Sequence, residues 1–180
     1  MTTETRSTPA AEAAAAKTTT KSGTITANRL KMLGDDLKSL AAGYDQVLID
    51  LGAGVEQTVQ NLTRSAGQVI VVVTDEPTSL TDAYAFIKVT QTEIPGMGFQ
   101  VVANIVNSMR EGERTYNTLL KACEAFLKIS PPLLGIIRRA AKVPEAIRSQ
   151  TSILTRSPNS EAACDVEKIA KKLLIPGIRS

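Results

Sequence analysis

Short apolar runs alternate with longer, helix-like segments, and this alternation constrains the fold more than any other feature of the chain. The runs are VLID at residues 47–50, VIVVV at 69–73, VVANIV at 101–106 and LLGII at 133–137. Nearly continuous apolar runs of this length are typical of parallel strands that are buried on both faces. The pattern therefore predicts a three-layer α/β sandwich with a mostly parallel sheet and right-handed crossovers.

Helical signals lie between these runs. Leucines recur at spacings of three and four between residues 30 and 40, which predicts one apolar stripe of a helix that ends near Gly43. Ser79 or Thr78 is a candidate cap for the helix after the second run, and Ser160 for the last helix. Further helices are predicted at residues 55–65, 79–92, 110–128, 144–150 and 160–174.

The chain divides into a polar start and one folded domain. Residues 1–27 are rich in Thr, Ala and Ser and have no apolar period, so they predict a disordered tail. Residues 28–180 then form one α/β domain, for which a chain with 43% hydrophobic residues has sufficient core. No apolar run has the length of a membrane span, and the first 21 residues lack the apolar centre of a secretory signal. We expect a cytoplasmic protein.

Composition excludes several kinds of chemistry. The chain has no histidine, which excludes Ser-His and Cys-His catalysis and His-ligated metals. Cys123 and Cys164 lie in helix-like contexts, which fits a reducing compartment better than a disulfide or a zinc site. The net charge of +3 is uneven, because residues 138–180 contain nine Lys or Arg and four Asp or Glu. An acidic partner, a lipid surface or a phosphate ligand near that end would suit this distribution.

The stretch QVLIDLGAGVE at residues 46–56 is the strongest candidate for chemistry. Asp50 ends an apolar run, at the sheet edge where open α/β folds bind ligands. Gly52, Ala53 and Gly54 would let backbone amides approach an anion. Such an aspartate can hold a water of a phosphate-bound Mg²⁺, or it can simply accept backbone amides at a helix start. The glycines favour phosphate.

Other polar residues follow the later runs. Glu76 comes just after the second run and Asp82 lies in the next helix, where they can line a ligand crevice, face a partner subunit or form a solvated surface. Asn104 is an amide within an apolar strand and needs a partner, either a protein group or a purine edge. Arg138 follows the last run and can meet phosphate, acidic protein or water.

A basic amphipathic helix ends the chain. In the sequence VEKIAKKLLIPGIR at residues 166–179, Val166, Ile169 and Leu173 form one stripe and the lysines lie elsewhere. Such a helix can pack on its own sheet with its lysines in water, or it can lie on anionic lipid.

These motifs resemble the MinD/ParA-type P-loop ATPases, and within them the flagellar-number regulators of the FlhG/FleN branch. YDQVLIDLGAG is similar to the family's YDxxxIDTGAG, TDEPTSLTDAYAFIK to its T-x-EPT-x-x-TDAYALIK, and VVANIVNSMREG to its strand with an adenine-contacting asparagine. The resemblance covers residues 30–174. It implies a MinD-type, P-loop NTPase-like fold, ATP and Mg²⁺ as ligands, a homodimer, and peripheral membrane contact through the C-terminal helix.

Roles for individual residues follow from the resemblance. Asp50 would be the Walker B residue that holds Mg²⁺ through water, and Gly52, Ala53 and Gly54 would be the switch II turn near the γ-phosphate. Asn104 would read the adenine.

The resemblance also implies partner surfaces. Arg138 would stand where the family closes over adenine, and Glu76 and Asp82 would lie near the dimer or partner face. The implied partners are a FleQ/FlrA-type transcription activator, an FlhF-type GTPase and flagellar switch proteins, without direct nucleic-acid contact.

The family's N-terminal strand and P-loop are missing from the pattern. No G-x-x-x-x-G-K-[ST] precedes residues 46–56, and KTTTKSGT at residues 17–24 lacks the glycines. Because phosphoryl transfer relies on positioning and charge stabilisation, we expect no appreciable ATPase activity from this chain alone. The leading interpretation is a truncated or degenerate regulator that acts mainly by protein binding. The alternatives are a MinD-family ATPase whose P-loop is supplied elsewhere, or an incomplete fragment of one.

A missing central strand has a structural consequence. The remaining sheet is expected to expose an edge or an apolar groove, and the chain is expected to self-associate or to be marginally soluble.

Overall fold

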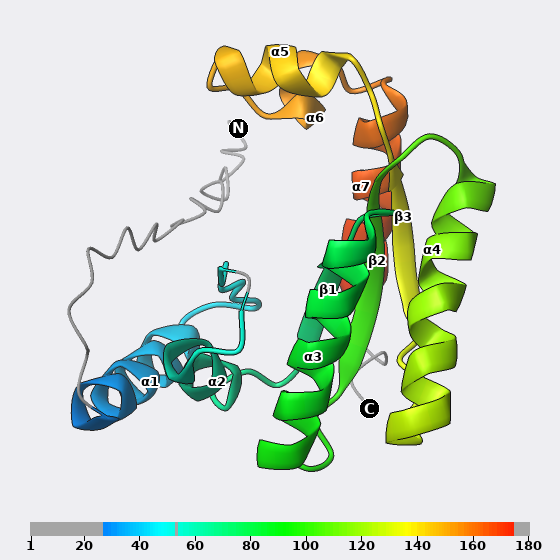
Figure 1. The fold of residues 1–180 in the computed structure, drawn as a ribbon. Coiled ribbons are helices and arrows are strands. Elements are labelled where there is room, and N and C mark those ends of the chain that lie inside the picture. Colours follow the sequence, from blue (N-terminus) through cyan, green and yellow to red (C-terminus); the bar gives the residue numbers. More distant parts are fainter. Residues whose placement is uncertain (1–26, 53, 175–180) are drawn as a thin grey trace, which may run out of the picture. The chain divides into compact units, whose positions relative to one another are not determined.

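The computed structural model describes residues 27–52 and 54–174 of the chain. These residues fall into two compact units, which divide between Gly52 and Ala53. The first unit contains α1 (Ala27–Ala41). The second contains every strand and all later helices of the described chain (Figure 1). The tail predicted at residues 1–27 lies almost entirely outside the described residues.

The segment that ends in Asp50 has no regular structure. Residues 46–50 form neither helix nor strand, and the side chains of Val47, Leu48 and Ile49 are exposed. The prediction of a strand at 47–50 is therefore wrong for the described structure. A strand needs a neighbour to hydrogen-bond with its backbone, and no described strand pairs with this segment. The helix predicted from the leucine stripe is confirmed as α1.

Three parallel strands form the sheet of the second unit, in the order β1-β2-β3. They are β1 (Val69–Val73), β2 (Phe99–Val106) and β3 (Leu133–Arg138), so the other three predicted strands are confirmed. The helices of this unit are α2 (Gln57–Thr63), α3 (Pro77–Glu93), α4 (Met109–Ala122) with its π-helical continuation η1 (Cys123–Leu127), α5 (Lys142–Arg148), α6 (Ile153–Arg156) and α7 (Glu161–Leu174).

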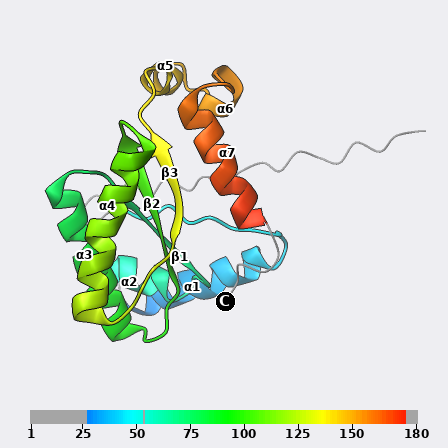
Figure 2. The same ribbon diagram turned by 90° about the vertical axis from the view of Figure 1, so that its right-hand side faces the viewer.

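Helices cover the two faces of the sheet unequally. Figure 2 shows α3 and α4 on one side of the strands and α7 on the other. The main core lies under α3 and α4 and includes Val71, Ile87, Val101 and Leu119. On the opposite face α7 packs on β3. The predicted three layers are confirmed, but burial on both faces fails at β1, where the side chain of Val72 is 56% exposed.

Two glycines let helices approach β3 closely from opposite sides. A Cβ atom on Gly112 of α4 would clash with the side chain of Ile136, and one on Gly135 would clash with Ile169 of α7. At each glycine, the space that a side chain would occupy is filled by the side chain of an isoleucine on the facing element. They fix how near α4 and α7 lie to the last strand.

Of the two predicted helix caps, one is confirmed. Ser160 Oγ accepts a hydrogen bond from the backbone N of Ala163 at 3.3 Å. The cap predicted at Thr78 or Ser79 is wrong, because α3 begins at Pro77 and its N-cap is Glu76. Proline is pre-organised for the first helical position, so the helix starts two residues earlier than Ser79. The Ser79 hydroxyl instead accepts from the backbone N of Thr74 at 3.0 Å.

Candidate functional site

The carboxyl ends of the strands carry the polar residues that the sequence singled out. At the end of β2, Asn104 Oδ1 accepts a hydrogen bond from the backbone N of Ile105 at 2.9 Å. Ile105 has a φ of 59°, in the left-handed region, and the pairing of β2 with β3 shifts register between Asn104 and Val106. A β-branched residue is strained in this conformation, and such strain is typical of functional positions. Sequence patterns contain no signal for it.

Arg138, at the end of β3, is held by two carboxylates of α7. Its Nε and Nη2 donate to Asp165 at 2.8 and 3.0 Å, its backbone N donates to Asp165 at 3.2 Å, and its Nη1 donates to Glu161. The hydrogen bond to Asp165 raises the pKa of Arg138. Burial alone would raise the pKa of Asp165, but the hydrogen bonds and charge of Arg138 outweigh it, so that this pKa is lowered. The guanidinium is therefore committed within the protein.

Asp165 is not among the residues predicted from the sequence, although it is the most buried charged side chain at this edge. It is 2% exposed, and it lies in α7 between Ala163 and Val166, where the apolar stripe of the helix meets the sheet. A carboxylate within such a stripe needs a buried cation. The need for such a cation, together with the two arginines that follow the last apolar run, is the only signal in the sequence for the Arg138–Asp165 ion pair.

The predicted nucleotide residues are divided between the two units. Asp50 and Gly52 lie in the first unit, whereas Gly54, Asn104 and Arg138 lie in the second. Gly54 has a φ of 135°, which favours glycine there, and Ala53 lies outside the described residues.

Among the described residues, neither unit alone supplies a set of groups that fits a magnesium nucleotide. In the second unit, Asn104 Oδ1 and the Arg138 guanidinium already have partners within the protein. In the described ranges 27–52 and 54–174, no three His, Cys, Asp or Glu residues form a cluster that could hold a metal. The nucleotide roles remain predictions. Glu76 and Asp82, the predicted partner-face residues, are exposed at the start of α3.

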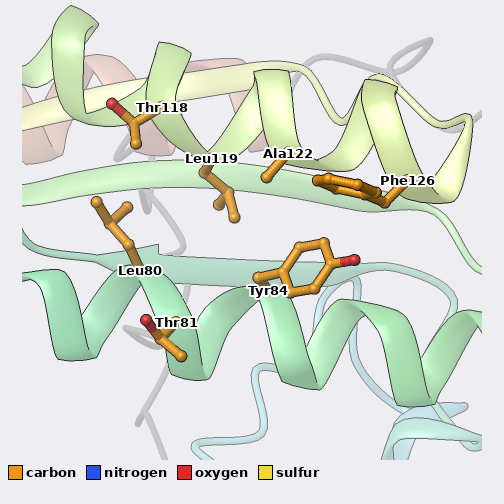
Figure 3. A pocket seen from close by; sticks show the side chains of 7 residues that line it. All are labelled: Leu80, Thr81, Tyr84, Thr118, Leu119, Ala122 and Phe126. Carbon is orange, nitrogen blue, oxygen red and sulfur yellow. The ribbon is translucent and has the colours of Figure 1, made fainter.

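An apolar groove lies between α3 and α4, with a volume of about 420 Å³. Figure 3 shows its side chains, which come from both helices and from η1. The lining residues are Leu80, Thr81, Tyr84, Thr118, Leu119, Ala122 and Phe126. Leu119 belongs to the core beneath, so a buried side chain forms the floor of the groove.

Both threonines of the groove are satisfied by their own helices. Thr81 Oγ1 donates to the carbonyl of Pro77 at 2.9 Å, and Thr118 Oγ1 donates to the carbonyl of Arg114 at 3.0 Å. Because each hydroxyl donates to the carbonyl four residues earlier in its own helix, neither needs a hydrogen-bond partner in the groove. The groove therefore offers a ligand almost entirely apolar contacts.

Phe126, at one end of the groove, lies in a π-helical turn. The predicted helix 110–128 is α-helical only to Ala122; it continues as η1 and ends at Lys128, whose φ is 59°. Phe126 in this turn is 76% exposed and meets Tyr84 edge to face, with ring centroids 6.5 Å apart. Single π turns occur often at functional sites. Here the turn leaves a large aromatic ring in water.

The C-terminal helix uses its apolar stripe within the protein. Ile169 packs over Gly135, and Lys172 Nζ donates to the carbonyl of Leu134 at 2.6 Å. Lys168 and Lys171 are 70% exposed, as expected for a helix that packs on its own sheet. Residues 175–180 lie outside the described residues. Among the described helices, none combines the length and the apolar composition of a transmembrane span.

Comparison with known proteins yields one family and a group of relatives. Residues 8–174 match the family described as cellulose biosynthesis protein BcsQ. The antiactivator FleN of Pseudomonas aeruginosa is 33% identical over 134 residues, which cover 74% of this chain and 48% of FleN. The flagellum site-determining protein YlxH of Helicobacter pylori is 26% identical, over 77% of this chain and 47% of YlxH. The chain thus spans about half the length of these relatives.

Solved structures agree on the fold. The MinC:MinD cell division complex of Aquifex aeolicus matches with a TM-score of 0.67 at 18% identity, over 81% of this chain and 59% of that one. The septum site-determining protein MinD of Pyrococcus horikoshii, complexed with Mg-ADP, matches with a TM-score of 0.66 at 23% identity, over 84% and 59%. These matches confirm the predicted MinD-like, P-loop NTPase-like α/β fold.

Proposed function

The chain belongs to the BcsQ family of MinD/ParA-type proteins, and from this premise we propose that it is an FlhG/FleN-like regulator of flagellar number and biosynthesis that acts in the cytoplasm, mainly by binding other proteins. Its similarity to an antiactivator and to a flagellum site-determining protein supports the flagellar role. The observation that carries the binding role is the apolar groove between α3 and α4 with its exposed Phe126.

The groove has the properties of a helix-binding site. An amphipathic helix binds by laying its apolar face between two helices, and exposed aromatic rings are common anchors in such contacts. Tyr84 and Phe126 would supply the anchors here. By helical spacing, Lys88 follows Tyr84 by one turn and Lys121 follows Thr118 by one turn, and both lysines are exposed. This basic rim fits a partner helix with acidic residues beside its apolar stripe.

The proposed occupant is a helix of the flagellar transcription activator of the FleQ/FlrA type. An antiactivator must bind its activator, and this is the role that the name of the Pseudomonas relative gives to that protein. An FlhF-type GTPase and flagellar switch proteins are further proposed partners. Glu76 and Asp82, at the exposed start of α3, would extend the partner face beyond the lysines, and there they would suit basic residues of the partner.

Binding measurements on purified proteins test this proposal. Isothermal titration of the activator into the chain should give binding that Phe126→Ala or Tyr84→Ala weakens by about tenfold or more, as loss of an anchor residue does. Ile147→Ala is the matched control, because Ile147 is 70% exposed but lies in α5, away from the groove. Affinity that is equal in all four proteins would overturn the groove assignment, and absence of any binding would overturn the antiactivator role.

A nucleotide switch is the alternative function, with the P-loop supplied elsewhere. It is favoured by the strained Ile105 beside Asn104 at the ligand-binding edge of the sheet, and by the Mg-ADP complex of the Pyrococcus MinD. In this alternative Asp50 would orient a magnesium-bound water, and Asn104 would exchange its bond to the Ile105 backbone for a purine edge. Calorimetric titration with Mg-ATP distinguishes the two functions. Binding heat that Asp50→Ala abolishes would support the nucleotide role. If Mg-ATP gives no binding heat, protein binding remains as the proposed function.

A further inference from the structure

The helical element that forms one wall of the groove contains one residue more than an α-helix would need. α4 is regular from Met109 to Ala122, and the next turn, Cys123–Leu127, is π-helical. A π turn bonds residues five apart rather than four, so it accommodates one extra residue, and the residues after it are set back by about 100° around the helix axis. The turn therefore decides which side chain of η1 faces the core.

Leu119 marks the core-facing direction of this element, because it is 2% exposed and belongs to the main core. In an unbroken α-helix, a residue seven positions later returns to within about 20° of the same direction. That residue is Phe126. An α-helical continuation would therefore direct Phe126 into the core and turn Leu127 about 80° away from it.

The π turn has the opposite result. Because it is set back by one position, Leu127 takes the direction of Leu119, and it packs against the same core. Phe126 is turned out of the core, where it is 76% exposed and meets Tyr84 edge to face at the groove (Figure 3). The π register and the α register thus direct different apolar side chains to one core position.

We propose that η1 exchanges between these two registers, so that Phe126 and Leu127 compete for the same core position. In the π register Leu127 fills the core and Phe126 lies at the groove. In the α register Phe126 enters the core and Leu127 is turned away. Each register buries one large apolar side chain, so neither leaves a cavity at this position. Helix register shifts take microseconds to milliseconds.

Opposing contributions at the end of η1 keep the two registers close in free energy. Two exposed hydrogen bonds stabilise the π register: Ser130 Oγ donates to Glu124 at 3.0 Å, and Lys128 Nζ donates to the carbonyl of Ala125 at 3.0 Å. The backbone of Lys128 opposes them, because its φ of 59° is unfavourable for a residue with a Cβ atom. Hydrogen bonds of this kind contribute little more than such strain costs.

This exchange would regulate the groove, a consequence that rests on the proposed function. A partner helix that uses Phe126 as an anchor would bind only the π register, so that partner binding would shift the population of η1 toward that register. The exchange itself is a property of the chain alone. All the groups that take part in it belong to the second unit.

Fluorine NMR of the chain labelled with 4-fluorophenylalanine tests the exchange without a partner. The chain has three phenylalanines, of which Phe99 is 6% exposed and serves as a buried reference. The resonance of Phe126, identified by its loss in Phe126→Leu, should show relaxation dispersion between an exposed and a buried state. Deletion of Ala125 removes the extra residue, so that a regular α-helix directs Leu127 to the core and Phe126 to the groove. This variant should keep the exposed resonance and lose the dispersion.

A second variant shifts the exchange in the other direction. Leu127→Ala removes the competitor for the core position and should raise the population with buried Phe126 by about tenfold or more. Val69→Ala, the matched control, shortens another partly buried side chain of the same core and should leave Phe126 exposed. Circular dichroism checks the fold of each variant. Deletion of Ala125 shortens no core side chain, so it decides the question even where Leu127→Ala does not fold.

Three results would overturn the proposal. They are absence of dispersion at Phe126 in the parent chain, dispersion that persists after deletion of Ala125, and a Phe126 that stays exposed in folded Leu127→Ala. The proposed function is tested separately. If the activator does not bind while the fluorine resonances behave as described, the exchange of registers stands and the antiactivator role does not.

Discussion

Asp165 accepts three hydrogen bonds from Arg138, two from the guanidinium and one from the backbone, at 2.8, 3.0 and 3.2 Å. The carboxylate is 2% exposed. One residue of α7 thus satisfies both the side chain and the outward backbone N of the last residue of β3. It links the end of the sheet to the C-terminal helix.

Removing this carboxylate should destabilise the protein strongly. Asp165→Ala leaves Arg138 partly buried without its main partner, and we expect a loss of about 3 kcal/mol in the free energy of unfolding. Glu161→Ala, which removes the exposed second partner, should cost less than about 1 kcal/mol. Urea unfolding of the three proteins measures both values. Equal losses would mean that burial of the pair does not decide its contribution.

The same pair predicts a loss of stability in acid. The pKa of Asp165 is lower in the folded protein than in the unfolded chain, where it is about 3.9. Its contribution is therefore full above pH ~3.9 and is lost as the pH falls through the lower folded pKa. Glu167, whose pKa the hydrogen bond from Lys171 also lowers, acts in the same direction. Asp165→Asn should unfold with a shallower dependence on pH below ~4, as urea midpoints across this range will show.

Filling the close approach of α4 to β3 should be costly. Gly112→Ala places a Cβ against Ile136, for which we expect a loss of about 1–3 kcal/mol. Gly67→Ala, where a Cβ meets nothing within 4 Å, is the matched control and should be nearly neutral. Ile136→Ala removes all three side-chain atoms that the new Cβ would meet, so it should cost less in the Gly112→Ala background than alone. A double-mutant cycle with no coupling between the two sites would contradict this contact.

Relieving the strain at Ile105 should stabilise the protein. A β-branched side chain in the left-handed region costs about 1–2 kcal/mol, and this one is 44% exposed, so little packing is lost with it. Ile105→Asn should therefore raise the thermal midpoint, because asparagine tolerates this conformation. Ile105→Leu, which removes the branch at Cβ but keeps a large side chain, should raise the thermal midpoint by less. A midpoint lowered by Ile105→Asn would show that packing outweighs strain.

The two cysteines should differ in reactivity. Cys123 is fully buried, and burial, with a smaller contribution from the charge of Glu124, raises its pKa. Cys164 is only partly buried. Since the thiolate is the reactive form, a thiol reagent at neutral pH should modify Cys164 and spare Cys123 until the protein unfolds. Mass spectrometry of the Cys164→Ser variant, which should take up no reagent when native, checks the assignment.

The sequence predicts what depends on local pattern and misses what depends on neighbours. The runs that became β1, β2 and β3 were recognisable because continuous apolar residues suit strands between layers, and Ser160 was recognisable as a cap. The run at 47–50 has the same composition, yet it forms no strand in the described structure, because pairing depends on a neighbouring strand.

In the candidate sites, too, the sequence predicted what depends on local pattern and missed what depends on neighbours distant in sequence. The sequence left phosphate, acidic protein and water open as partners of Arg138, and its distance in sequence from Asp165 hid the intramolecular partner that the structure shows. The groove depends on a π turn at Cys123–Leu127, and no residue pattern distinguishes that turn from a continued α-helix. Motif similarity identified the family and fold, whereas the groove depends on how α3, α4 and η1 pack.

The Lys172 contact with the Leu134 carbonyl ties the last described turn of α7 to β3. The ion pair between Asp165 and Arg138 holds the first half of the same helix to the same strand. These two attachments can open one after the other, like two separate fasteners on one element. Lys172→Met should release only the last turn, so that its amides exchange faster while those around Asp165 stay protected.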